Sequence, residues 1–335
     1  MAVCRTQNSS LSASRECLPS TCGTGSRLTV VSSIEYPTIT SSKDQLMSNA
    51  STAFLCEARR SFHAALLSAV LRIDAAGIPT NADKDSRVSV AIARGIIDIL
   101  GKRGPGTRMA GQIAGNHFEM ICKEYLDTVF PHLQHLRPGT WTISKGVGAG
   151  RLAIAQFDQY AHLAALDNAA RSNPELAAAL GSDYLIKPDV VIIRHPEMDA
   201  TINSQEMLVD ETCARLTSLR KCNNTQPILH ASISCKWTLR SDRAQNARSE
   251  GLNLVRNRKG RLPHIAVITG EPTPSRIASI ALGTGDIDCV YHFALTELLS
   301  TVNTLGYVDA EDLLHTMIDG KRLRDIADLP LDLII

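Results

Sequence analysis

The sequence predicts an α/β fold, in which one domain is built around a central mixed β-sheet flanked by helices. The chain has 335 residues and is 44% hydrophobic, which is enough to form a substantial core. Helical spacing of apolar residues dominates the first half of the folded part. Short β-rich runs interleaved with helices follow in the second half, an order typical of a mixed sheet with helices packed on it.

Residues 1–50 differ in composition from the rest of the chain. Of the first 52 residues, 19 are Ser or Thr, and no helical periodicity is present. Such a segment cannot bury enough apolar surface to offset the entropy lost on ordering. We therefore expect a disordered leader before a single domain over residues 51–335. A transit peptide and a translation start at Met47 are the alternatives.

The elements of the folded part follow from periodicity, caps and β-branched runs. Apolar residues that recur on one face predict helices over residues 57–74, 87–100, 115–130, 173–181, 289–303 and 310–318. Short β-rich runs predict strands over residues 189–194, 228–237 and 264–270. A further helix, over residues 241–256, is expected between the second and third strands.

Charge and cysteine content limit the classes of function. The net charge is +1, so any attraction to nucleic acid must come from a local patch. The nine cysteines are scattered, odd in number and without a CxxC pair, which favours reduced thiols in a cytoplasmic protein. No run of 18 apolar residues is present, so we expect no membrane association.

Three residues form the candidate catalytic set. Asp189 follows Pro188 at the start of an apolar strand, Lys236 ends a second strand, and Glu250 lies fourteen residues later on a helix. A carboxylate and a lysine on adjacent strands suit a metal-dependent phosphodiesterase, because the acid binds Mg²⁺ and the lysine stabilises charge on the phosphate. An acid two residues before the lysine would complete the site. Ser234 occupies that position, so in a real site of this kind the missing carboxylate must come from elsewhere, and Glu250 can supply it.

The segment from Lys236 to Arg261 is strongly basic, with eight basic residues against two acidic ones, a net charge of +6. It suits contact with phosphates, and we expect Lys259 to make one. Arg240 and Arg243 can each donate two hydrogen bonds to guanine, and Asp242 can accept one from cytosine. Taken alone, these features also fit ordinary structure. A Pro-Asp pair is common in turns, and the Arg–Ser–Asp–Arg cluster fits a solvated helix start.

The chain closely resembles the NgoMIV-like type II restriction endonucleases of the PD-(D/E)XK superfamily. The resemblance runs from about Phe54 to the C-terminus. It is carried by "NPELAAALGSDY", "LHASISCKWTLRSDRAQNARSEGLNLVRNRKGRLPHI", "EPTPSRI", "IALGTG", "IDCVYHFAL" and "GKRL". It implies a PD-(D/E)XK core with a central mixed sheet, and a Mg²⁺-dependent enzyme with two ions in each active site.

The resemblance also implies roles for individual residues. The catalytic set becomes Asp189, Lys236, Glu250, Glu119 and Ser234, with the metal held by Asp189, Glu250 and the main-chain carbonyl of Cys235. The residues expected to recognise bases are Arg240, Asp242 and Arg243 for the inner CCGG, and Arg276, Gln112 and Asp83 for the outer G·C pair.

The resemblance predicts an enzyme that cuts double-stranded DNA at GCCGGC, as G/CCGGC, leaving four-base 5′ overhangs and defending a bacterial cell against foreign DNA. It also implies a homotetramer arranged as a dimer of dimers. A repair or junction-resolving nuclease with the same core is one alternative, but such an enzyme needs no base-reading Arg–Asp–Arg cluster. A non-catalytic DNA-binding module is another, but it needs no catalytic set.

Overall fold

The computed structural model describes residues 52–101, 111–148, 150, 152–181, 185–283 and 285–335. The expected leader over residues 1–50 lies outside them. Six strands form one sheet in the order β1-β2-β3-β4-β5-β6. The strands are β1 (Trp141–Lys145), β2 (Val190–Arg194), β3 (Ile228–Lys236), β4 (His264–Thr269), β5 (Cys289–His292) and β6 (Leu323–Asp325). β2 runs antiparallel to both β1 and β3, whereas β3 to β6 run parallel to one another, so the mixed sheet is confirmed.

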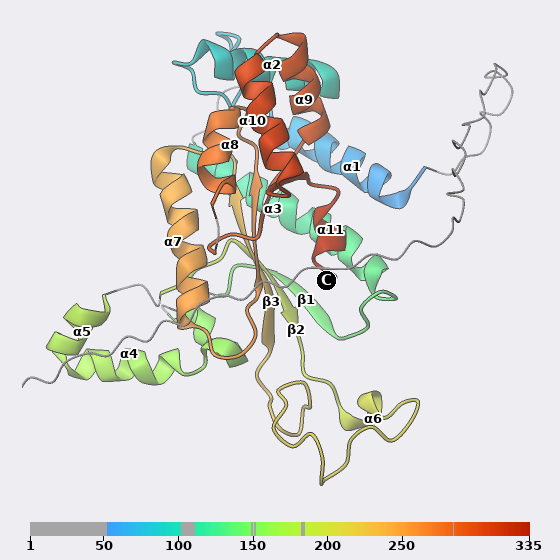
Figure 1. Cartoon of the computed structure of the whole chain (residues 1–335), viewed down its shortest axis with the longest axis vertical. Coiled ribbons are helices and arrows are strands. Elements are labelled where there is room, and N and C mark those ends of the chain that lie inside the picture. Colours follow the sequence, from blue (N-terminus) through green and yellow to red (C-terminus); the bar gives the residue numbers. More distant parts are fainter. Residues whose placement is uncertain (1–51, 102–110, 149, 151, 182–184, 284) are drawn as a thin grey trace, which may run out of the picture. The chain divides into compact units, whose positions relative to one another are not determined.

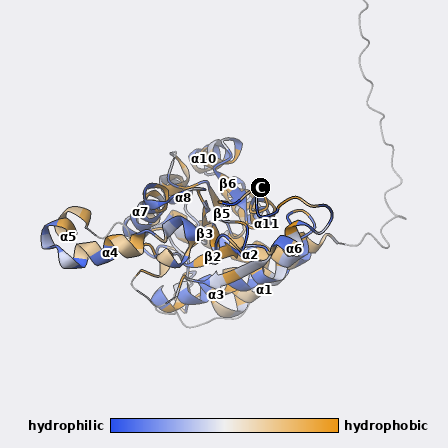
Figure 2. Ribbon diagram, turned by 90° about the horizontal axis from the view of Figure 1, so that it is seen from below, coloured by the Kyte–Doolittle hydropathy of each residue, from blue (hydrophilic) through white to orange (hydrophobic). Residues whose placement is uncertain are grey.

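Helices cover both faces of the sheet. Figure 2 shows α1 and α3 on one side of it and α7, α8 and α10 on the other. The helices are α1 (Phe54–Ala69), α2 (Arg87–Leu100), α3 (Gly111–Val129), α4 (Leu163–Ser172), α5 (Pro174–Leu180), α6 (Asp199–Ile202), α7 (Ser241–Asn257), α8 (Pro274–Ala281), α9 (Leu295–Thr304), α10 (Val308–Asp319) and α11 (Leu329–Asp332). Because both faces are covered, seven consecutive residues of β3 are buried.

One expected helix begins differently in the structure. The helix expected over residues 289–303 is split into strand β5, over Cys289–His292, and helix α9, which begins at Leu295. The segment "CVYHFAL" is continuously apolar, and a buried parallel strand has no alternation that would distinguish it from a buried helix. Its register with β4 and β6 on either side makes it a strand.

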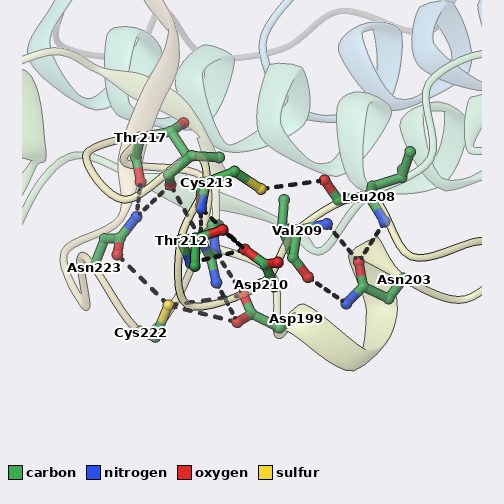
Figure 3. Close-up of polar contacts among 12 residues, drawn as sticks. Asp199, Asn203, Leu208, Val209, Asp210, Thr212, Cys213, Thr217, Cys222 and Asn223 are labelled. Carbon is green, nitrogen blue, oxygen red and sulfur yellow. Dashed lines mark hydrogen bonds and ion pairs between the residues drawn. The ribbon is translucent and has the colours of Figure 1, made fainter.

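The connection between β2 and β3 contains the short helix α6 (Figure 1) and an isolated bridge between Glu197 and Arg220, and it is also held by side-chain contacts (Figure 3). The guanidinium of Arg220 is buried and donates to both carboxylate oxygens of Asp199, at 2.9 and 2.7 Å. The carboxylate of Asp210 accepts three hydrogen bonds from Thr212 and Cys213, which lower the pKa of Asp210 to about 2. Side chains thus satisfy main-chain polar groups that the sheet leaves unpaired.

A glycine fixes the position of α7 against the loop that precedes β5. A Cβ atom added at Gly251 would lie 2.1 Å from the main-chain oxygen of Asp286, so only glycine permits this approach. Three residues earlier, Arg248 donates to the Asp286 carboxylate at 2.8 Å. These two contacts determine where α7 presents Glu250, which is adjacent to Gly251 in the chain.

Candidate active site and nucleic-acid interface

The antiparallel pairing of β2 and β3 brings the expected acid and lysine together. Val190 lies opposite Ile233, so Asp189 at the start of β2 faces the end of β3. Its Oδ2 accepts hydrogen bonds from the Nζ of Lys236 at 2.7 Å and from the main-chain N–H of Cys235 at 2.8 Å. Burial alone would lower the pKa of Lys236, but the negative charge of Asp189 and its hydrogen bond outweigh burial and raise this pKa overall. The lysine therefore carries a proton at neutral pH.

Glu250 lies beside Ser234, where the substitute acid was expected. From α7 it reaches the hydroxyl of Ser234, which donates to Glu250 Oε1 at 3.4 Å. Burial and the neighbouring negative charge of Asp189 raise the pKa of Glu250 to about 8. The carboxylates of Asp189 and Glu250 therefore share a partly buried site with Lys236. Additional positive charge at this point would favour the ionised form of both acids.

Glu119, on α3, belongs to the same cluster. Burial, with a contribution from the charge of Asp189, raises the pKa of Glu119. Its Oε2 lies 3.3 Å from the Nζ of Lys145, the last residue of β1. Sequence reasoning missed Lys145 because strand β1 was not expected. Alternation in "WTISK" is the signal that could have suggested this short, half-buried strand.

Four of the six expected base-recognition residues line one cavity of about 220 Å³, here called the arginine cavity. They are Asp83, Arg240, Arg243 and Arg276. Arg276 donates to the carboxylate of Asp83, which lowers the pKa of that acid. The Nη1 of Arg243 donates to the hydroxyl of Thr238, another lining residue, at 2.8 Å.

The other two expected residues flank the arginine cavity. Asp242 is exposed in the first turn of α7, between two cavity-lining arginines. Gln112 is exposed at the start of α3, directly after the lining residue Gly111. Trp237, the residue after Lys236, also lines the cavity. The cavity therefore adjoins the candidate catalytic cluster along the chain.

A buried glutamate that sequence reasoning missed connects the segments around the arginine cavity. Glu271 has no exposed surface. Its Oε2 accepts from the main-chain N–H of Leu239 at 2.8 Å, its Oε1 accepts from that of Thr273 at 3.2 Å, and Arg276 lies 3.9 Å away. Glu271 thus joins the segment before Arg240 to the start of α8. Its position in the "EPTPSRI" segment, two residues before a capping threonine, is the only signal for it in the sequence.

Comparison with known proteins shows the family of the chain. Residues 62–335 match the family described as NgoMIV restriction enzyme. The type II restriction enzyme NgoMIV of Neisseria gonorrhoeae is 58% identical to the chain over 278 residues, which make up 83% of this chain and 97% of that relative. The mixed sheet flanked by helices, together with these similarities, identifies the chain as a type II restriction endonuclease, an enzyme that cleaves double-stranded DNA at specific sites. The chain belongs to the NgoMIV restriction enzyme family.

These findings resolve the class of function that the sequence left open, because they favour restriction over repair and over binding without cleavage. Within the described part of the chain, no helix has the length and apolar character needed to cross a bilayer.

Proposed function

We propose that this enzyme cleaves GCCGGC as G/CCGGC, leaving four-base 5′ overhangs, and that it requires Mg²⁺, with two ions in each active site. The 2.7 Å contact between Lys236 and Asp189, with Glu250 beside them, carries the catalytic part of this proposal. The arginine cavity supports the base preference, because paired hydrogen bonds from arginine to guanine are the commonest specific contact with DNA.

The donor set of the catalytic cluster fits Mg²⁺. Among the described residues, no group of three or more His, Cys, Asp or Glu side chains could hold a metal ion by itself, so an ion here would be held by fewer side chains. Asp189 and Glu250, with the main-chain carbonyl of Cys235, would form an oxygen-only set, and Mg²⁺ is usually held by one or two carboxylates together with water. A bound ion would polarise the scissile phosphate and lower the pKa of a water molecule.

The side chains of the cluster have separate tasks in this proposal. Lys236 carries the proton that stabilises charge on the phosphoryl oxygens. Asp189 orients this lysine through its 2.7 Å hydrogen bond. Ser234 orients Glu250, and Glu119 adds a third carboxylate next to the site. Each active site cuts one strand, and a palindrome requires two sites related by a two-fold axis. A homodimer meets this requirement, and two such dimers complete the proposed tetramer.

Mapping the cut ends of a digested plasmid of known sequence tests the proposed site and cleavage position. Ends that begin with CCGGC and occur only at GCCGGC are expected, in Mg²⁺ but not in EDTA. Lys236→Ala should abolish cleavage while specific binding persists, because the arginine cavity is separate from the lysine. Blunt ends, or cutting at CCGG without the outer pair, would contradict the proposal. The proposed cytoplasmic location follows from the role, since incoming DNA is met there.

A plasmid with two GCCGGC sites tests the tetramer. It should be cut faster than a one-site plasmid, and a short cognate duplex added in trans should speed cutting of the one-site plasmid. Equal rates for both plasmids, together with a dimeric mass in light scattering, would contradict the dimer of dimers.

A further inference from the structure

A second cavity, of about 370 Å³, lies at the opposite end of β3 from the catalytic lysine. It opens beside Ile228–His230, the first residues of that strand, whereas Lys236 is the last. Eight residue steps at about 3.3 Å each separate the two ends by roughly 26 Å. We call this the distal basic cavity.

The charges of this cavity are mostly positive. Its lining includes Arg137, Arg194, Lys259 and Arg261, against one carboxylate, Asp158. Asp158 accepts a hydrogen bond from the hydroxyl of Ser218, also in the lining, at 2.7 Å. The side chains of Lys259 and Arg261 are exposed and have no hydrogen-bond or ion-pair partner among the described residues.

Two of the arginines are held in place by an aromatic ring. The guanidinium groups of Arg194 and Arg137 lie 5.2 and 5.8 Å from the ring centre of Trp141. Arg137 also donates to the main-chain oxygens of Ile334 and Ile335, each at 2.8 Å. The buried Nε of Arg194 has no hydrogen-bond partner, although its Nη2 donates to a main-chain oxygen at 3.4 Å. A donor is therefore fixed in position without an acceptor.

The same cations repel one another. Burial and the positive charges of Arg261 and Arg194 lower the pKa of Arg137. Burial, with smaller contributions from Arg137 and Arg261, lowers the pKa of the neighbouring His230 to about 4. An anion in the cavity would relieve this repulsion. Phosphate oxygens match the planar fork of arginine.

We propose that the distal basic cavity binds a small phosphate-bearing anion, such as pyrophosphate or the diphosphate group of a nucleotide. The cavity is larger than a single phosphate needs, and its volume falls within the range of small-molecule sites. This site is distinct from the catalytic cluster and needs no DNA. It also gives Lys259 a role other than the DNA contact expected from the basic segment.

Calorimetric titration of the full chain with pyrophosphate, in EDTA and at constant ionic strength, tests the proposal. Arg261→Gln should weaken binding about fivefold or more, because it removes one charged donor. Arg256→Gln is the matched control, since Arg256 is exposed on the last turn of α7 and does not line the cavity. Lys236→Ala should also leave binding unchanged, which separates this site from the catalytic one.

Several outcomes would overturn the proposal. Equal weakening by Arg256→Gln and Arg261→Gln would show general charge attraction rather than a site. Absence of saturable binding of pyrophosphate would also overturn the proposal. Titration with ADP and with inorganic phosphate identifies the source of the phosphate group, and binding of either supports the site. If pyrophosphate, ADP and phosphate do not bind, but a duplex without GCCGGC binds and this binding depends on Arg261, the cavity contacts DNA and the small-anion proposal is wrong.

Discussion

Replacing Glu250 with Gln should change how stability depends on pH. Burial and the charge of Asp189 raise the pKa of Glu250 from 4.5 to about 8. Between these two values the folded protein holds a proton that the unfolded chain releases. The stabilisation from this group is therefore complete below about pH 4.5 and is lost as pH rises through 8. A glutamine at this position stays neutral throughout.

The size of the effect follows from the shift in pKa. Each unit corresponds to about 1.4 kcal/mol, so the full shift sets an upper limit of about 5 kcal/mol. The side chain keeps some solvent contact, which screens the repulsion, and we expect about 2–3 kcal/mol. Without divalent ions at pH 8.5, Glu250→Gln should therefore melt about 5 °C above the wild type. At pH 4.5 the two proteins should melt at nearly the same temperature.

Thermal melts in EDTA from pH 4.5 to pH 8.5 measure this difference. Glu124→Gln is a suitable control, because Glu124 is an exposed residue of α3. Adding Mg²⁺ at pH 8.5 should stabilise the wild type more than the Glu250 variant, since an ionised carboxylate favours the cation. Cleavage by the variant should fall sharply in the same buffer, because Ser234 cannot replace a carboxylate.

Two results would refute this reasoning. Melting temperatures of wild type and Glu250→Gln that stay parallel across the pH range would show that the carboxyl is not held protonated by its surroundings. Wild-type cleavage by the variant in Mg²⁺ would show that the acid on α7 does not replace the one missing before Lys236.

Three further predictions concern other parts of the molecule. Gly251→Ala should lower both the melting temperature and the cleavage rate, because the added Cβ would collide with a main-chain oxygen. Gly115→Ala, where the added Cβ meets open space, should change neither quantity in thermal melts and plasmid digests. Glu271→Gln should reduce the preference for GCCGGC over sites with a changed outer pair, measured by gel shift, and equal loss on all sequences would contradict its positioning of Arg276. Deleting residues 1–46 should leave activity and melting temperature unchanged, and a clear drop in either would show that the leader packs on the fold.

The class of fold followed from local patterns. Helical periodicity before Pro188 and β-rich runs at 189–194, 228–237 and 264–270 were sufficient for a mixed sheet, because each pattern depends on near neighbours in the chain. The split at Cys289–His292 was not predictable in this way. A buried parallel strand and a buried helix are both continuously apolar, and only the strands on either side distinguish them.

The sequence by itself predicted the residue types of the proposed catalytic cluster and a substitute acid at Glu250. Only the tertiary structure decided which groups meet. Arg243 and Arg261 belong to one basic segment, yet they line separate cavities, because most of α7, which is 17 residues and about 25 Å long, lies between them. Strand pairing places Lys145 beside Glu119, and burial places Glu271 beneath the segments that line the arginine cavity. Such contacts depend on how distant segments pack, and adjacency in the chain does not encode that.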